Sequence, residues 1–171
     1  MIGYSEVIQT MAAMIIFSMI LLSANSMIHR NSMLQIDGEL EQEVISLGQE
    51  IIEEARSKSF DNVTVNSSAP PAIIPGGFTA AGSLGADSGE GTRTAFDDFD
   101  DYDGWSTVMT TTHGDFDISV DVFYVDGTNF QPLGAPSTFK KIEVTVTSAF
   151  LREDDAPRQY VLEFIRNYYA D

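Results

Sequence analysis

The feature that most constrains this chain is a stretch of 22 residues, Val7 to Ile28, that contains no Asp, Glu, Lys or Arg. As an α-helix it is about 33 Å long, and the hydrocarbon core of a bilayer is about 30 Å thick. The stretch therefore predicts a helix that crosses a membrane or packs in an equally apolar environment. A single carboxylate, Glu6, immediately precedes it.

A plain N-terminal membrane anchor explains the apolar stretch but gives Glu6 no role. An ionised carboxylate deep in a bilayer costs about 2.5–3.5 kcal/mol on insertion scales, so such groups usually have a partner. The cost is smaller near the interface, and Glu6 alone does not decide between an anchor and a packed helix.

Residues 29–60 continue the helical pattern with a different composition. Apolar residues recur at spacings of three and four, which is typical of an amphipathic helix. They are Met33, Ile36, Leu40, Val44, Leu47, Ile51 and Ala55. Because no proline precedes residue 60, residues 1–28 and 29–60 are predicted to form one helix. We expect Leu40, Val44, Leu47 and Ile51 to pack against the rest of the fold or against neighbouring chains.

Composition excludes several classes of function. The chain has 26 acidic and 9 basic residues and a formal net charge of −17, whereas nucleic-acid binding needs a basic surface. It has no cysteine, which excludes disulfides and thiol chemistry. The two histidines, His29 and His113, have no nucleophile or carboxylate at a recognisable motif spacing. We therefore expect neither direct nucleic-acid binding nor enzymatic activity.

Residues 61–105 are rich in Gly, Ala, Ser, Thr and Pro and predict a long surface loop. The sequence leaves open whether this loop is a flexible connector or a structured surface that meets a partner. Asn62 and Asn66 each begin an Asn-x-Ser/Thr sequon. Because such short motifs often arise by chance, they are weak candidates for glycosylation.

The loop ends in an acidic turn, "FDDFDDYDGW", at residues 96–105. Calcium takes six to eight oxygen ligands, so clustered carboxylates make this turn a candidate calcium site. The candidate ligands are Asp97, Asp98, Asp100, Asp101 and Asp103. Their spacing does not match an EF-hand. The alternative is a solvated acidic turn anchored by its aromatic residues, Phe96, Phe99, Tyr102 and Trp105.

Residues 106–171 alternate between apolar and polar, which predicts half-buried antiparallel strands. Strands are expected in "FDISVDVFYV", "FKKIEVTVTSAF" and "RQYVLEFIRNYY", with a weaker one at residues 106–112. In the first of these, one face consists of Phe116, Ile118, Val120, Val122 and Tyr124. The predicted fold class is α+β. The hydrophobic half of the long helix protrudes, and its amphipathic half packs on a sheet of three or four antiparallel strands.

This arrangement resembles the type IV pilin and pseudopilin superfamily. The resemblance rests on the apolar N-terminal segment with its early Glu6, the amphipathic helix that follows, the variable loop and the antiparallel sheet. It implies a leader-bearing precursor that a prepilin peptidase trims in the inner membrane. It also implies that assembly machinery polymerises the subunit into an extracellular helical filament with the apolar helices in its centre. For Glu6 it implies pairing with the N-terminal amine, here that of Met1, of a neighbouring subunit.

Three functions are consistent with these patterns. The first is a structural subunit of a pilus-like filament. The second is a minor pseudopilin of a type II secretion or DNA-uptake machine. The third is a monomeric, membrane-anchored extracytoplasmic binding domain. The sequence favours the first.

Overall fold

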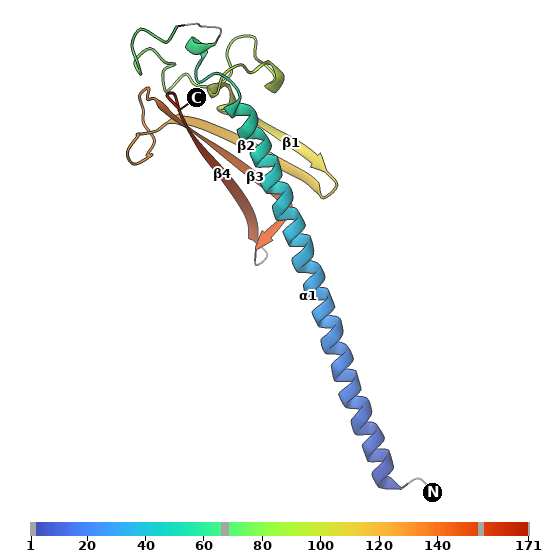
Figure 1. The fold of residues 1–171 in the computed structure, drawn as a ribbon. Helices are drawn as coiled ribbons and strands as arrows, with labels where there is room; N and C mark the ends of the chain where they lie inside the picture. Colours follow the sequence, from blue (N-terminus) through green and yellow to red (C-terminus); the bar gives the residue numbers. More distant parts are fainter. Residues whose placement is uncertain (1–2, 66–68, 154–155, 171) are drawn as a thin grey trace. The chain divides into compact units, whose positions relative to one another are not determined.

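The computed structural model describes residues 3–65, 69–153 and 156–170. Within these residues it has one α-helix, α1 (Tyr4–Arg56), and the short 3-10 helices η1 (Asn62–Thr64), η2 (Arg93–Ala95) and η3 (Asp100–Tyr102). The strands are β1 (Ser106–Thr111), β2 (Gly114–Tyr124), β3 (Phe139–Glu153) and β4 (Ala156–Asn167) (Figure 1). The predicted α+β class, with one long N-terminal helix and an antiparallel sheet, is confirmed.

The chain divides into two compact units between Glu41 and Gln42, and α1 contributes to both. In the N-terminal unit, residues 3–37 are all exposed. By length and composition α1 is suited to cross a membrane. Hydroxyl groups in its apolar stretch bond back to the helix, because Thr10 Oγ1 donates to the carbonyl oxygen of Val7 and Ser18 Oγ to that of Met14. These bonds satisfy polar groups that an apolar environment would leave without a partner.

The C-terminal unit, residues 42–171, is called the head below. Its sheet has the order β1-β2-β3-β4, and each neighbouring pair is antiparallel. Alternation in β2 and β3 places one side-chain set inward, as the sequence predicts. The buried members are Phe116, Ile118, Val120, Val122 and Tyr124 of β2 and Ile142, Val144 and Val146 of β3.

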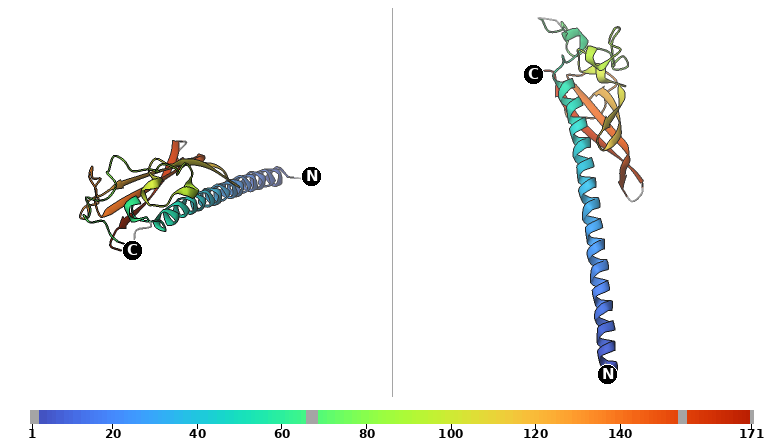
Figure 2. Two further views of the ribbon diagram at one scale, coloured as in Figure 1. Left: turned by 90° about the horizontal axis from the view of Figure 1, so that it is seen from above. Right: turned by 90° about the vertical axis from the view of Figure 1, so that its right-hand side faces the viewer.

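The last turns of α1 cover the inward face of this sheet (Figures 1 and 2). Val44 and Ile51 are fully buried, and Leu47 is nearly so. The helix and β4 approach closely at Gly48, where a Cβ atom would lie 2.9 Å from the side chain of Leu162. The helical half with apolar spacing thus provides the cover that the apolar face of the sheet requires.

The helix ends at Arg56, four residues before the end that the sequence predicts. Buried Arg166 of β4 donates from Nη1 to the carbonyl oxygens of Lys58 and Ser59, at 2.8 and 3.1 Å. Lys58 in turn donates from Nζ to the carbonyl oxygen of Phe96 at 2.7 Å. Arg166 therefore holds the carbonyl groups of the residues that follow the helix, and Lys58 links this segment to the acidic turn.

The loop after α1 is anchored to the head by aromatic residues. Phe60 and Phe78 are buried with Tyr124, and Tyr168 packs against both phenyl rings at centroid distances of 5.4 and 5.1 Å. The question that the sequence left open is thus answered in part. The described residues around Phe78 pack on the core and do not form a free connector.

Candidate functional site

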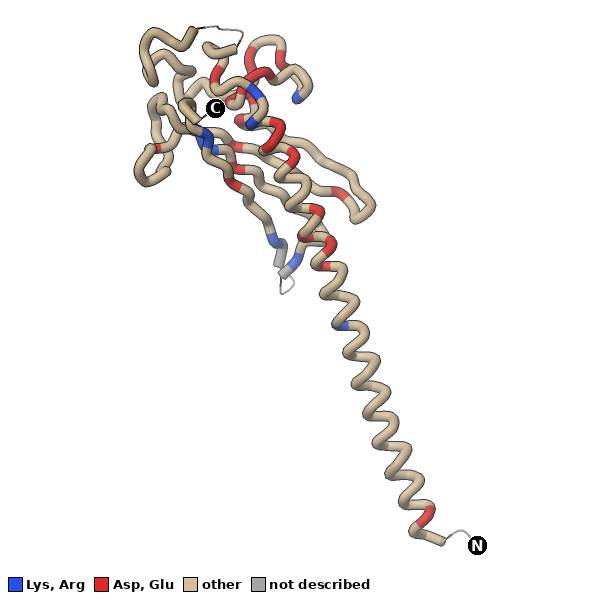
Figure 3. The backbone as a smooth tube through the Cα atoms, viewed as in Figure 1, with Lys and Arg blue, Asp and Glu red and all other residues tan. Residues whose placement is uncertain are grey.

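The first candidate site is the apolar surface of α1 in the N-terminal unit. All residues from Val7 to Ile28 are exposed, and large side chains such as Met14 and Leu22 are each 71% exposed. Figure 3 shows this part of the helix almost without charge, whereas acidic residues gather in the C-terminal part of the chain. A soluble surface rarely exposes so much contiguous apolar area, so the segment is suited to lipid or to other apolar helices.

Glu6 lies in the first turn of α1, at the N-terminal border of this apolar surface. Its Oε2 accepts a hydrogen bond from the backbone nitrogen of Gly3 at 3.3 Å, and the side chain is exposed. The carboxylate therefore stands at the positive end of the helix dipole, where an anion is stabilised. Met1, the predicted source of the partner amine, lies outside the described residues.

The predicted helix-packing residues fall on one side of α1. Leu40, Val44, Leu47 and Ile51 are each at most 9% exposed, whereas Met33 and Ile36, earlier in the same stripe, are 68% and 54% exposed. Packing of Val44, Leu47 and Ile51 inside the head accounts for the burial of these three. Whether any stripe residue also contacts other chains stays a prediction.

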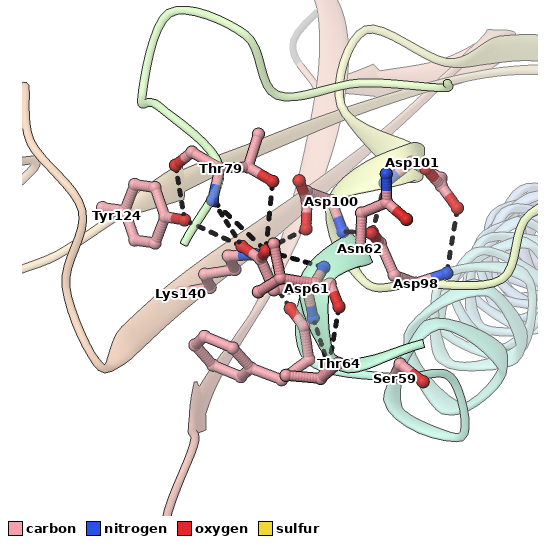
Figure 4. Close-up of polar contacts among 12 residues, drawn as sticks. Ser59, Asp61, Asn62, Thr64, Thr79, Asp98, Asp100, Asp101, Tyr124 and Lys140 are labelled. Carbon is pink, nitrogen blue, oxygen red and sulfur yellow. Dashed lines mark hydrogen bonds and ion pairs between the residues drawn. The ribbon is translucent and has the colours of Figure 1, made fainter. Parts of the chain in front are cut away.

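The second candidate site is a buried ion cluster in the head, which we call the Lys140 cluster: Asp61, Asp98, Asp100, Tyr124 and Lys140. Lys140 Nζ lies 2.7 Å from Asp61 Oδ2 and 2.5 Å from Asp100 Oδ1 (Figure 4). It also donates to the carbonyl oxygen of Phe60 at 2.8 Å. The side chains of Lys140 and Asp61 are fully buried, and that of Asp100 is 4% exposed.

The two carboxylates beside Lys140 have opposite pKa shifts. Burial raises the pKa of Asp61, but the attraction of Lys140 and hydrogen bonds from Thr79 and Tyr124 outweigh it, so this pKa lies below its ordinary value. Burial also raises the pKa of Asp100, and here the attraction of Lys140 does not compensate. Asp61 is therefore the firmly ionised member of the pair.

Asp98 is the most perturbed acid of the cluster. Burial, together with the charges of Asp100 and Asp101, raises its pKa to about 9. Its Oδ1 accepts from the backbone nitrogens of Asp100 and Asp101 at 2.7 and 3.2 Å. At neutral pH Asp98 is consequently a buried carboxylic acid that can donate a proton or a hydrogen bond.

The structure corrects the alternative of a solvated acidic turn. Asp98, Asp100 and Asp101 are buried at 1, 3 and 2% exposure. The reason is internal hydrogen bonding, since Asp101 Oδ2 accepts from the backbone nitrogens of Asp97 and Asp98 at 2.8 and 2.9 Å. The expected aromatic anchoring is present for Phe96, Phe99 and Tyr102, which are buried.

The five candidate calcium ligands are not brought to one point. Carboxylate oxygens of Asp97, Asp98 and Asp101 lie within 4.8 Å of one another. Asp100 instead pairs with Lys140, and Asp103 Oδ1 accepts from the backbone nitrogen of Val122 at 2.7 Å. Since the oxygens of Asp98 and Asp101 already accept backbone hydrogen bonds, the geometry favours a structural use of this turn. Calcium binding stays a prediction.

The sequon that begins at Asn62 overlaps with a capping interaction. Asn62 begins η1, is exposed, and donates from Nδ2 to Asp87. Thr64, the third residue of its sequon, forms a capping box with Asp61. Asn66 lies outside the described residues. Glycosylation of either asparagine stays a prediction.

Lys140 and Arg166 are the residues that sequence reasoning missed. They stand directly opposite each other in the β3–β4 register, both buried on the inward face. The signal was present, because Lys140 precedes Ile142 by two residues and Arg166 follows Phe164 by two. Period-two alternation, extended by one step in each strand, places both cations inward.

No protein-family model, curated protein or solved structure matches this chain significantly.

Proposed function

We propose that this chain is a structural subunit of an extracellular, pilus-like filament that assembles through its N-terminal helices. In this proposal the subunit resides in the inner membrane before assembly, where prepilin peptidase and assembly machinery act on it. It then joins a helical homopolymer on the cell surface. The head forms the exterior of the filament and performs no chemistry on a substrate.

The observation that carries the proposal is the pairing of an exposed, uncharged helical surface with one carboxylate at its border. The surface runs from Val7 to Ile28, and Glu6 adjoins it. Lipid or a bundle of identical helices would cover the apolar side chains equally well. The carboxylate favours the bundle, because a neighbouring N-terminal amine gives it a partner that lipid does not offer.

The charge of the chain agrees with a polymer whose heads face water. A formal net charge of −17 keeps heads soluble, although it also makes neighbouring heads repel each other. Attraction between subunits must then come from the apolar helices. This division of roles matches the distribution of charge along the chain in Figure 3.

The monomeric membrane-anchored domain is the second candidate, and the length and composition of α1 support it equally. The minor pseudopilin differs from the main proposal in abundance and not in chemistry. Because all three functions use the same apolar helix, only an experiment that measures assembly can distinguish the filament subunit from the two alternatives.

Shearing of cells that produce the chain separates the three functions. Sheared surface material is collected, probed with an antibody against the head and imaged by electron microscopy. Abundant labelled filaments support the proposal, whereas trace amounts at filament tips indicate a minor subunit. Absence from the sheared fraction, with all of the chain recovered as detergent-soluble monomers, would contradict filament assembly.

A further inference from the structure

We propose that the side chains of Lys140 and Asp100 condense to an amide, which links β3 covalently to the turn that contains η3. The structure brings the two groups together in a sealed site. Lys140 Nζ lies 2.5 Å from Asp100 Oδ1, and the side chains are 0% and 4% exposed. The inference concerns the head alone and does not depend on filament assembly.

Proximity of the two groups lowers the activation barrier of the condensation. Because Cγ of Asp100 is bonded to Oδ1, the lysine nitrogen lies near the distance of about 3–3.5 Å at which reacting atoms are poised for attack. Holding reactants in this way corresponds to effective concentrations of roughly 10⁵–10⁸ M, which lowers the activation barrier for attack of the amine on the carboxyl group. Burial also protects the resulting amide from hydrolysis.

Asp61 is suited to accept a proton from Lys140. Its Oδ2 lies 2.7 Å from Nζ and also receives hydrogen bonds from Tyr124 Oη at 3.0 Å and the Thr79 nitrogen at 3.1 Å. These donors keep Asp61 ionised, and an ionised carboxylate in contact with an ammonium group can accept its proton. The neutral amine that remains is the nucleophile.

Asp98 supplies the acid on the other side of the reacting bond. Its Oδ1 accepts a hydrogen bond from the backbone nitrogen of Asp100 at 2.7 Å, so Asp98 adjoins the reacting group. In its protonated form it can polarise the Asp100 carboxyl group and pass a proton to the oxygen that leaves. The base, Asp61, and the acid, Asp98, thus contact the two reaction partners from different chain segments (Figure 4).

The step balances without any co-reactant. The ammonium group of Lys140 carries three hydrogens, of which one stays on the amide nitrogen and two leave with one oxygen of Asp100 as water. The new bond joins Nζ to Cγ, and one Cγ–O bond breaks. Asp61 and Asp98 end in their initial protonation states, and no oxidant or reductant is involved.

The product also relieves an electrostatic conflict. Lys140 stands directly opposite Arg166 in the β3–β4 register, and both are buried. Like charges in directly opposed positions are unfavourable. The amide removes the charge of Lys140 together with that of Asp100, which leaves Asp61 and Arg166 as the buried charges beside the link.

Peptide mapping of the full chain, purified in detergent and unfolded before digestion, tests the proposal. We expect the peptide that contains Lys140 to be joined to the one that contains Asp100, with a combined mass lower by one water molecule. Separate, unmodified peptides at their full masses would overturn the proposal. A link from Lys140 to Asp61 would overturn the assignment of Asp100 as the electrophile.

Variants test the roles of the individual groups. Asp100→Asn should lose ammonia where the natural chain loses water, so both chains should reach the same final mass. Asp98→Asn keeps the acceptor for the turn but lacks the acid, and should slow the appearance of the link at least tenfold in freshly synthesised protein. Lys140→Arg should abolish the link. Lys141→Arg, the matched control at the neighbouring, partly exposed ion pair with Glu143 and Glu163, should retain it.

Discussion

At the residue scale, the head depends on one buried lysine, Lys140. Lysine side chains are almost never fully buried in proteins unless they are paired with a group of opposite charge. Lys140 is fully buried, and its partners come from two loop segments, at Asp61 and Asp100. Thr79 of the loop and Tyr124 of β2 donate to the same carboxylate of Asp61, which ties the loop to the sheet. The cluster therefore orders the loop around one charge.

Removing the charge of Lys140 should destabilise the head far more than removing the charge of the neighbouring Lys141. Lys140→Met leaves two buried carboxylates without a cation and should lower the free energy of unfolding by about 3–5 kcal/mol. Lys141→Met is the control, because Lys141 pairs with Glu143 and Glu163 near the surface and should cost about 1 kcal/mol or less. Chemical denaturation of both variants gives the comparison, and equal losses would contradict the assigned role of Lys140.

Asp98 should make the head less stable as pH rises. Its pKa is about 9 in the folded protein and has a reference value of 3.8, so between these values the folded state binds more protons than the unfolded state. The free energy of unfolding then falls with increasing pH. Asp98→Asn removes this contribution and should flatten the pH dependence of the melting temperature between pH 5 and 9. An unchanged profile would show that Asp98 titrates normally.

The acidic turn should be insensitive to calcium if its carboxylates serve the backbone. A ligand that binds the folded state raises its stability by mass action. Because oxygens of Asp98 and Asp101 already accept backbone hydrogen bonds, we expect the same melting curve in millimolar calcium and in chelator. A clear rise in melting temperature with calcium, lost in Asp97→Asn, would instead establish the turn as a metal site.

At the element scale, a charge introduced into the amphipathic half of α1 should destabilise the head on the buried side of the helix and have little effect on its exposed side. Leu47→Asp buries an unpaired carboxylate and should lower the free energy of unfolding by more than about 3 kcal/mol. Ile45→Asp is the matched control two residues away, because Ile45 is 43% exposed, and it should change stability by about 1 kcal/mol or less. Thermal melting followed by circular dichroism distinguishes them, and equal effects would contradict the packing.

The elements themselves could be predicted because their patterns are local. The spacing of Leu40, Val44, Leu47 and Ile51 indicates the helix face, and the alternation from Phe116 to Tyr124 indicates the inward face of β2. The Lys140 cluster could not be predicted in the same way. Lys140 lies 79 residues after Asp61 and 40 residues after Asp100. No local sequence pattern links either aspartate to a strand so distant along the chain.

The interpretation of residues 96–105 as a solvated acidic turn was wrong for a related reason. From composition alone, residues 96–105 are expected to be a polar, solvated segment, because aspartates are rarely buried. Backbone donors of the turn itself and the distant Lys140 made burial possible. The sequence did indicate the anchors, since Phe99 and Tyr102 lie three residues apart among the acids, and both are fully buried.

At the scale of the whole molecule, the account separates two tasks along the chain. The N-terminal unit offers exposed apolar side chains and one carboxylate, whereas the head contains a packed core and most of the acidic residues. A monomer in a membrane uses the first unit as an anchor. In the proposed filament it is the interface between subunits, and a neighbouring N-terminal amine is the charged partner of Glu6.

Counting filaments from Glu6→Leu is the measurement that tests this claim most directly. The variant keeps or improves membrane insertion, but in a bundle it leaves the neighbouring amine as an unpaired buried charge, at a cost of about 3–5 kcal/mol. Gln9→Leu, one turn further along the exposed helix, changes a polar residue without removing a charge and serves as the control. At equal membrane levels by immunoblot, electron microscopy should find few or no filaments for Glu6→Leu and normal numbers for Gln9→Leu. Natural filament numbers from Glu6→Leu would contradict the account.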